Sequence, residues 1–157
     1  MDLYALLKLA HLLGAAVLFG TGLGIAFFMF WADRTGDVPT VAATARAVVL
    51  ADYLFTATAV VLQPITGVGL ALHLGYSLWE GWILLSLALY AMIGACWLPV
   101  VWLQRQMRDL AAEAASDGAP LTAVYRRHMR HWFLLGWPAF LGVLAIYWLM
   151  ITRPDLG

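Results

Sequence analysis

The most regular feature of the sequence is a series of long stretches without charged side chains. Four such stretches cover residues 9–32, 53–79, 81–104 and 132–152. Each exceeds the roughly 20 apolar residues that a helix needs to cross a hydrocarbon core about 30 Å thick. Because only a helix or a closed barrel satisfies its backbone hydrogen bonds within lipid, the stretches predict four transmembrane helices. The predicted spans are residues 4–31, 50–74, 80–104 and 131–152.

Composition supports a membrane protein and excludes several other classes. Hydrophobic residues make up 64% of the chain and charged residues 11%, with a mean hydropathy of +0.84. A soluble domain carries about 25% charged residues. The chain is therefore predicted to be all-α, an integral membrane four-helix bundle in which residues 1–157 form one domain. Nine basic residues balance nine acidic ones, so no nucleic acid is expected as a partner.

The basic residues predict the orientation of the bundle. Seven of the nine fall in the connections that follow the first and third spans, namely Arg34, Arg46, Arg105, Arg108, Arg126, Arg127 and Arg130. The positive-inside rule makes these connections cytoplasmic and both termini extracytoplasmic. The connections themselves read as helical extensions. Asp37 and Pro39 are typical of a helix start, while residues 116–120 predict the end of the extended third helix.

His11 is the most informative polar residue within a span. It follows Lys8 by three residues, so both lie on one helix face, and it sits about 12 Å below Leu3 at the helical rise. Inside the membrane the nitrogen atoms of its imidazole need a partner, which protein, water or a ligand can supply. Gly14 and Ala15 continue this face with small side chains. Such residues permit close packing of helices, and they equally permit a flat macrocycle to approach an axial histidine.

Depth suggests which other polar residues share the layer of His11. Ser86 and Tyr147 lie about 9 Å and 7.5 Å from the ends of their spans, which places both within reach of that layer. His73 lies closer to the outer surface and is expected at the edge of a bound ring or in water. Gln63 is expected to hydrogen-bond between helices. Asp52, at the inner end of the second span, is expected to pair with a cytoplasmic arginine.

Three motifs carry a resemblance to a known family. They are residues 1–11 (MDLYALLKLAH), 18–22 (LFGTG) and 94–104 (GACWLPVVWLQ). Together they resemble a bacterial family of predicted integral membrane proteins, domain of unknown function 2269, over nearly the whole chain. More distantly, the Lys8 to His11 motif resembles HemJ-type protoporphyrinogen oxidases and the membrane domain of CopD-type copper-resistance proteins.

The resemblance implies a cofactor. In HemJ-type enzymes the corresponding histidine of the first helix binds haem b, and this role would fall to His11. Those enzymes also carry a lysine needed for activity four residues after a Gly-Trp pair. Here the pair is Gly81-Trp82 and the position holds Ser86. The resemblance therefore implies haem binding more strongly than the oxidase reaction.

These observations lead to one main hypothesis and two alternatives. The main hypothesis is a haem b-binding, cytochrome b-like protein of the bacterial inner membrane, in which His11 ligates the iron and Lys8, His73 or Arg153 neutralises the propionates. It would act as an oxidoreductase with an electron-transfer partner or substrate still to be identified. The alternatives are a non-catalytic helical subunit or scaffold, and copper handling like that of CopD. Membrane lipid and further copies of the chain are the other expected partners.

Overall fold

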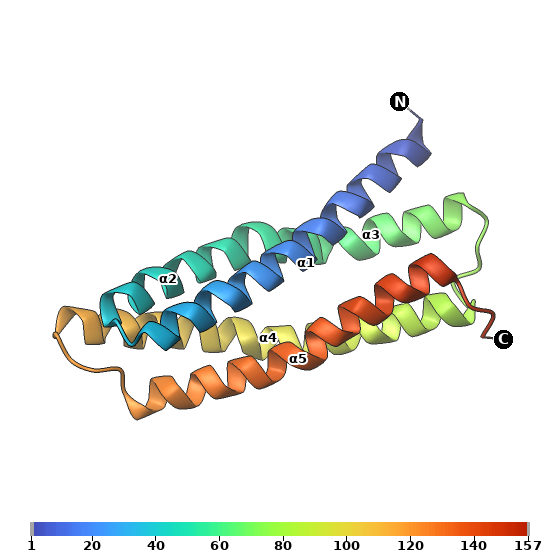
Figure 1. Ribbon diagram of the computed structural model, residues 1–157. Coiled ribbons are helices and arrows are strands. Elements are labelled where there is room, and N and C mark those ends of the chain that lie inside the picture. The colour runs from blue at the N-terminus through green and yellow to red at the C-terminus, as the bar shows by residue number, and fades with distance from the viewer. Residues whose placement is uncertain (1, 157) are drawn as a thin grey trace.

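The computed structural model describes residues 2–156, so Met1 of the first motif lies outside the described residues. The elements are α1 (Leu3–Thr35), α2 (Val38–Ala51), the π-helix η1 (Asp52–Thr56), α3 (Ala57–His73), α4 (Gly81–Ser116) and α5 (Ala123–Thr152) (Figure 1). No strand occurs in this part of the chain. Because α2, η1 and α3 follow one another without a break, the described residues form four long helical rods. The predicted all-α four-helix fold is confirmed.

Each rod is long and apolar enough to cross a membrane. The four candidate spans contain 33, 36, 36 and 30 residues. At 1.5 Å per residue even the shortest is about 45 Å long, so every rod extends beyond the hydrocarbon core. The protein is therefore a multi-pass integral membrane protein. Both termini lie at the same end of the bundle (Figure 1), and the assignment of that end to the extracytoplasmic side stays a prediction from the arginines.

The helix boundaries follow local sequence signals. Asp37 caps α2 by accepting a hydrogen bond from the Thr40 amide at 3.0 Å, and Pro39 occupies the first turn. Gly36 precedes this cap with a φ of 70°, a left-handed conformation that glycine adopts without steric cost. At the other connection α4 ends at Ser116, and Thr122 caps α5 by accepting from the Tyr125 amide at 3.2 Å. Both connections are thus short links between helical extensions, as predicted.

The tightly packed core lies at the end of the bundle that carries the arginine-rich connections. Its buried members are Ile25, Met29, Ala32, Val41, Ala42, Ala45, Val48, Leu103, Met107, Ala111, Tyr125, Met129 and Trp132. By contrast, many long apolar side chains of the spans are exposed, including Leu13 and Leu134. An apolar surface of this extent is what a lipid-facing bundle requires.

Toward the termini, the helices pack as two pairs. α1 packs against α3, and α4 packs along α5 (Figure 1). Two tyrosines join the pairs: the Tyr147 hydroxyl donates to the carbonyl of Ala15 at 2.6 Å, and the Tyr90 hydroxyl donates to the carbonyl of Val60. Phe19 also stacks on Phe140. The outer half of the bundle is therefore joined by a few specific contacts and not by a continuous buried core.

Candidate functional site

His11 on α1 faces α3, where its imidazole contacts Thr66. His11 Nδ1 is 2.9 Å from Thr66 Oγ1. The Thr66 hydroxyl has one proton, and it donates that proton to the carbonyl of Leu62 at 2.8 Å. His11 Nδ1 therefore carries the ring proton and donates it to Thr66. This tautomer leaves a lone pair on Nε2, which makes no hydrogen bond with residues 2–156.

Two glycines allow α1 and α3 to approach closely at His11. A Cβ at Gly67 would lie 3.0 Å from His11 Cε1, so the imidazole rests directly against the backbone of α3. A Cβ at Gly14 would lie 2.7 Å from Gln63 Nε2. Gln63 uses this space to donate to the carbonyl of His11 at 2.8 Å. The helix-to-helix role expected for Gln63 is confirmed, and its side chain fills the space beside Gly14.

The residues expected in the layer of His11 have separate partners. Tyr147 reaches α1 one turn from His11, through its hydrogen bond to the Ala15 carbonyl. Ser86 is buried, and its hydroxyl donates to the carbonyl of Trp82 within α4 at 2.7 Å. Tyr147 therefore contacts α1 one turn away from His11, whereas the Ser86 hydroxyl donates its hydrogen bond within α4.

Lys8 and His73 meet at Tyr4, near the outer end of the bundle. The His73 ring stacks on the Tyr4 ring with centroids 6.0 Å apart and an interplanar angle of 16°. Lys8 Nζ lies 5.4 Å from the centroid of the same ring, within the range of a cation–π interaction. Arg153 lies elsewhere at this end and donates to the Tyr76 hydroxyl at 2.7 Å. His73 therefore lies outside the immediate surroundings of His11, as its depth in the sequence indicates.

A second polar cluster surrounds Asp52, at the start of η1. The carboxylate is 5% exposed and accepts from Trp97 Nε1 at 3.3 Å. With the Gln104 amide oriented so that its oxygen accepts from Trp132 Nε1 at 3.3 Å, the amide nitrogen donates to Asp52 Oδ2 at 3.1 Å. The expected ion pair between Asp52 and an arginine is wrong for the described residues, because two neutral donors from α4, Trp97 and Gln104, occupy the carboxylate oxygens.

The sequence contains a signal for this cluster. Trp97 and Gln104 are seven residues apart, which places them on one face of α4. A tryptophan and a glutamine on the same face of a membrane helix present two donors to one partner. The sequence interpretation favoured nearby arginines as partners of Asp52 and so missed this signal. Arg105 directly follows Gln104 in the chain, but its side chain is exposed.

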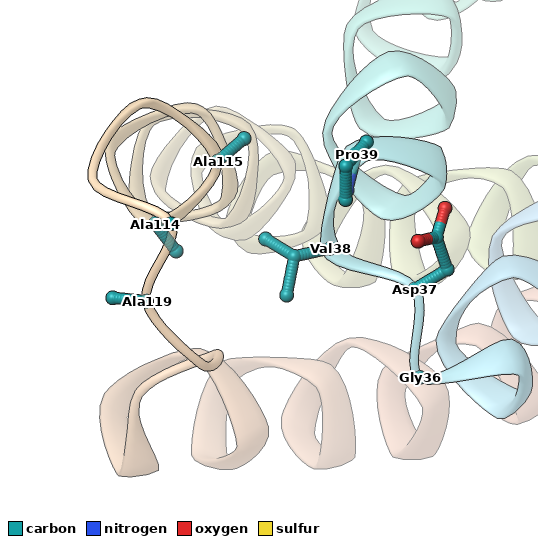
Figure 2. A pocket seen from close by; sticks show the side chains of 8 residues that line it. Gly36, Asp37, Val38, Pro39, Ala114, Ala115 and Ala119 are labelled. Atoms are coloured by element: carbon teal, nitrogen blue, oxygen red, sulfur yellow. The ribbon is translucent and has the colours of Figure 1, made fainter.

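Two neighbouring hollows lie at the opposite end of the bundle from the termini. One has a volume of about 320 Å³ and is lined by Gly36, Asp37, Val38, Pro39, Ala114, Ala115, Gly118 and Ala119. Figure 2 shows Val38 projecting between the start of α2 and the turn after α4. The second, of about 240 Å³, includes Asp33 and Arg126. Within residues 2–156 no three His, Cys, Asp or Glu side chains gather as metal ligands.

Comparison with known proteins gives one match. The model of the family described as "Predicted integral membrane protein (DUF2269)" matches residues 5–154. The chain belongs to this family. The match confirms the resemblance carried by the three sequence motifs, and its description states membrane integration. No curated protein and no solved structure matches the chain.

Proposed function

We propose that this family member is a haem b-binding, cytochrome b-like membrane protein in which His11 Nε2 is an axial ligand of the iron. The observation that carries the proposal is the hydrogen bond between His11 Nδ1 and Thr66. A histidine that ligates a metal through one ring nitrogen almost always donates from the other to a fixed acceptor. Thr66 is such an acceptor, because its own proton is used by the Leu62 carbonyl.

The imidazole nitrogen is a donor atom that suits haem iron, whereas the space on the Gly67 and Gly14 sides is filled by protein atoms. Haem b, when bound, supplies one-electron or oxygen chemistry at its iron. Thr66 fixes the tautomer and Gly67 supports the imidazole ring. On the Gly14 side the end of the Gln63 side chain fills the space, and Gln63 is a flexible residue that must turn away for a ring to approach there. Lys8, beside Tyr4, supplies a cation for a propionate at the outer surface.

An absorption spectrum tests the proposal directly. Protein purified in mild detergent from haem-replete cells is expected to show a Soret band, and an α-band after reduction with dithionite. His11→Ala is expected to remove both bands, because it removes the proposed ligand. His131→Ala is the matched control, since His131 is exposed near the start of α5, at the opposite end of the bundle, and should leave the bands unchanged. A colourless wild type from well-supplied cells would refute haem binding.

A second candidate is a non-catalytic helical subunit, and a separate observation favours it. Gln63 and Thr66 both connect α3 to His11, so the polar groups within this part of the membrane join two helices. Hydrogen bonds of this kind stabilise helix association by about 0.6 kcal/mol on average. A colourless wild type in which His11→Ala lowers the unfolding temperature would support this role. In that case His11 serves to join α1 to α3.

A further inference from the structure

The Asp52 cluster is independent of the His11 site and has a different chemistry. Asp52 starts the π-helix that connects α2 to α3, within the candidate membrane span Val38–His73. Single-turn π-helices occur frequently at functional sites in helical proteins. The side chain is buried in the bundle and does not face the aqueous surface. An ionisable residue in this position is expensive to retain unless it has a use or a counter-charge.

The structure provides hydrogen-bond donors and no counter-charge. Trp97 donates to one carboxylate oxygen, and Gln104 donates to the other. Trp132 fixes the orientation of the Gln104 amide, because an indole nitrogen can only donate. Within residues 2–156 the ion pair is Arg108 with Asp109, at a different place on α4.

The titratable groups of the surrounding helices do not compensate the charge either. At this end of the bundle they are Asp33 and Arg34 on α1, Arg46 on α2, Tyr53 on η1, Cys96, Arg105, Arg108, Asp109 and Glu113 on α4, and Tyr125, Arg126, Arg127, His128, Arg130 and His131 on α5. None of them makes a hydrogen bond or ion pair with Asp52 in the described part of the chain. On α3 the titratable residue is His73, at the far end. The carboxylate is therefore a buried anion stabilised by neutral dipoles alone.

Thr56 supplies a group that suits both protonation states. It is buried, it ends η1, and its Oγ1 has no hydrogen-bond partner among residues 2–156. A hydroxyl can donate to a carboxylate and can equally accept from a carboxylic acid. Thr56 lies four residues after Asp52, about one turn of a π-helix, so it is placed on the same side of the rod.

We infer that Asp52 is a proton-binding site within the arginine-rich half of the bundle. The carboxylate takes up one proton to become the carboxylic acid and releases the same proton when it ionises again. Trp97 and Gln104 hold the group in place in both states. Burial without a paired cation among the described residues makes the charged carboxylate costly and favours the neutral carboxylic acid.

Infrared titration of the protein in lipid nanodiscs tests this inference. The wild type, labelled with ¹³C-aspartate, is expected to show the carbonyl stretch of a protonated aspartic acid at pH values where exposed aspartates are already ionised. Asp52→Asn should remove this band, and Asp109→Asn should leave it. A wild type without the band, or with a band that titrates together with the exposed aspartates, would overturn the inference.

A second variant keeps the test decisive if Asp52→Asn does not fold. Trp97→Phe removes one donor to the carboxylate and leaves the aspartate itself in place. Since the lost hydrogen bond favours the ionised form, proton uptake should move to still higher pH and the carbonyl band should shift in frequency. An unchanged titration in Trp97→Phe would show that the indole does not act on the proton-binding group. Neither variant touches His11, so these outcomes are separate from those for haem binding.

Discussion

At the scale of single residues, Gly14 shows how one missing side chain places two others. The Gln63 amide occupies the space where a Cβ would stand, 2.7 Å from Nε2, and bonds the His11 carbonyl. Gly14→Ala is expected to displace Gln63 and to destabilise the protein by about 1–3 kcal/mol, as overpacking does. Reversible unfolding in mixed detergent micelles measures this. Gly20→Ala is the control, because nothing lies within 4 Å of its Cβ position. Equal effects would contradict the argument.

Thr66 is the residue on which the orientation of His11 depends. Thr66→Val keeps the shape of the side chain but removes the acceptor of the Nδ1 proton. If His11 ligates haem, loss of such a partner is expected to weaken haem affinity about 10- to 100-fold. Thr66→Ser retains the hydroxyl and should retain affinity. Haem titration of the apoprotein, followed by absorption, measures both variants. A Thr66→Val protein with wild-type affinity would show that the hydrogen bond serves helix packing alone.

Sequence reasoning singled out His11 and the bond between helices at Gln63, but it did not identify Thr66 as the partner of the imidazole. The spacing of Lys8 and His11 and the absence of charge around them are local properties, and they show directly in the chain. The contact with Thr66 joins residues 55 positions apart, so it depends on how α1 packs on α3. The same holds for Asp52, whose two donors lie on α4, more than 40 positions away in the chain. Proximity in the chain suggested arginines as partners, whereas packing supplied an indole and an amide.

At the scale of elements, the cap of α2 makes a prediction about pH. Hydrogen bonds from Thr40, first from its side chain and then from its backbone, hold the pKa of Asp37 below its ordinary value. A carboxyl with a lowered folded-state pKa stabilises the cap above its unfolded pKa, and this stabilisation is lost as the pH falls through the folded value. The protection of the Thr40 and Val41 amides, measured relative to their intrinsic exchange rates, should therefore fall under acidic conditions.

Two variants test whether the loss of amide protection in acid comes from Asp37 itself or from a general effect of acid on the protein. Asp37→Asn keeps a capping side chain that does not titrate, so protection of the first turn should not depend on pH beyond the intrinsic exchange rate. Asp37→Ala should lose protection at every pH. Acid-sensitive exchange in Asp37→Asn, equal to that of the wild type, would show that another group is responsible.

The elements also show which parts of a fold a sequence determines locally. The start of α2 and the end of α4 were predictable, because caps, prolines and glycines act within a few residues. The π-helix was not predictable, because residues 52–56 contain no proline or glycine that would disturb a helix. The Asp52 side chain at its start contacts two donors on α4, which is a consequence of packing.

At the scale of the whole molecule, the bundle has one tightly packed end and one loosely joined end. Met29, Met107 and Tyr125 are almost fully buried at the arginine-rich end. At the other end the α1–α3 and α4–α5 pairs are joined mainly by the hydroxyls of Tyr90 and Tyr147 and the rings around Phe19. This asymmetry places the His11 site in the half of the bundle outside the main buried core.

Removing both tyrosine hydroxyls should therefore separate the two helix pairs at one end only. In the double variant Tyr90→Phe and Tyr147→Phe, spin labels at the exposed positions Leu74 and Ile151 are expected to show a broader distance distribution. Each lost hydrogen bond weakens the junction by about 0.6 kcal/mol, so the effect is a loosening and not unfolding. Pulsed electron paramagnetic resonance in a Cys96→Ser background makes the measurement.

The control for this prediction is a second pair of spin labels at the opposite end of the bundle. Labels at Ala43 on α2 and Val124 on α5, both exposed, report on the end of the bundle that holds the buried core. Their distance distribution should not change, because no core contact is altered. If both label pairs broadened, the tyrosines would stabilise the bundle as a whole. If neither did, the aromatic contacts around Phe19 would suffice to hold the pairs together, and access to His11 from between the pairs would require a larger rearrangement.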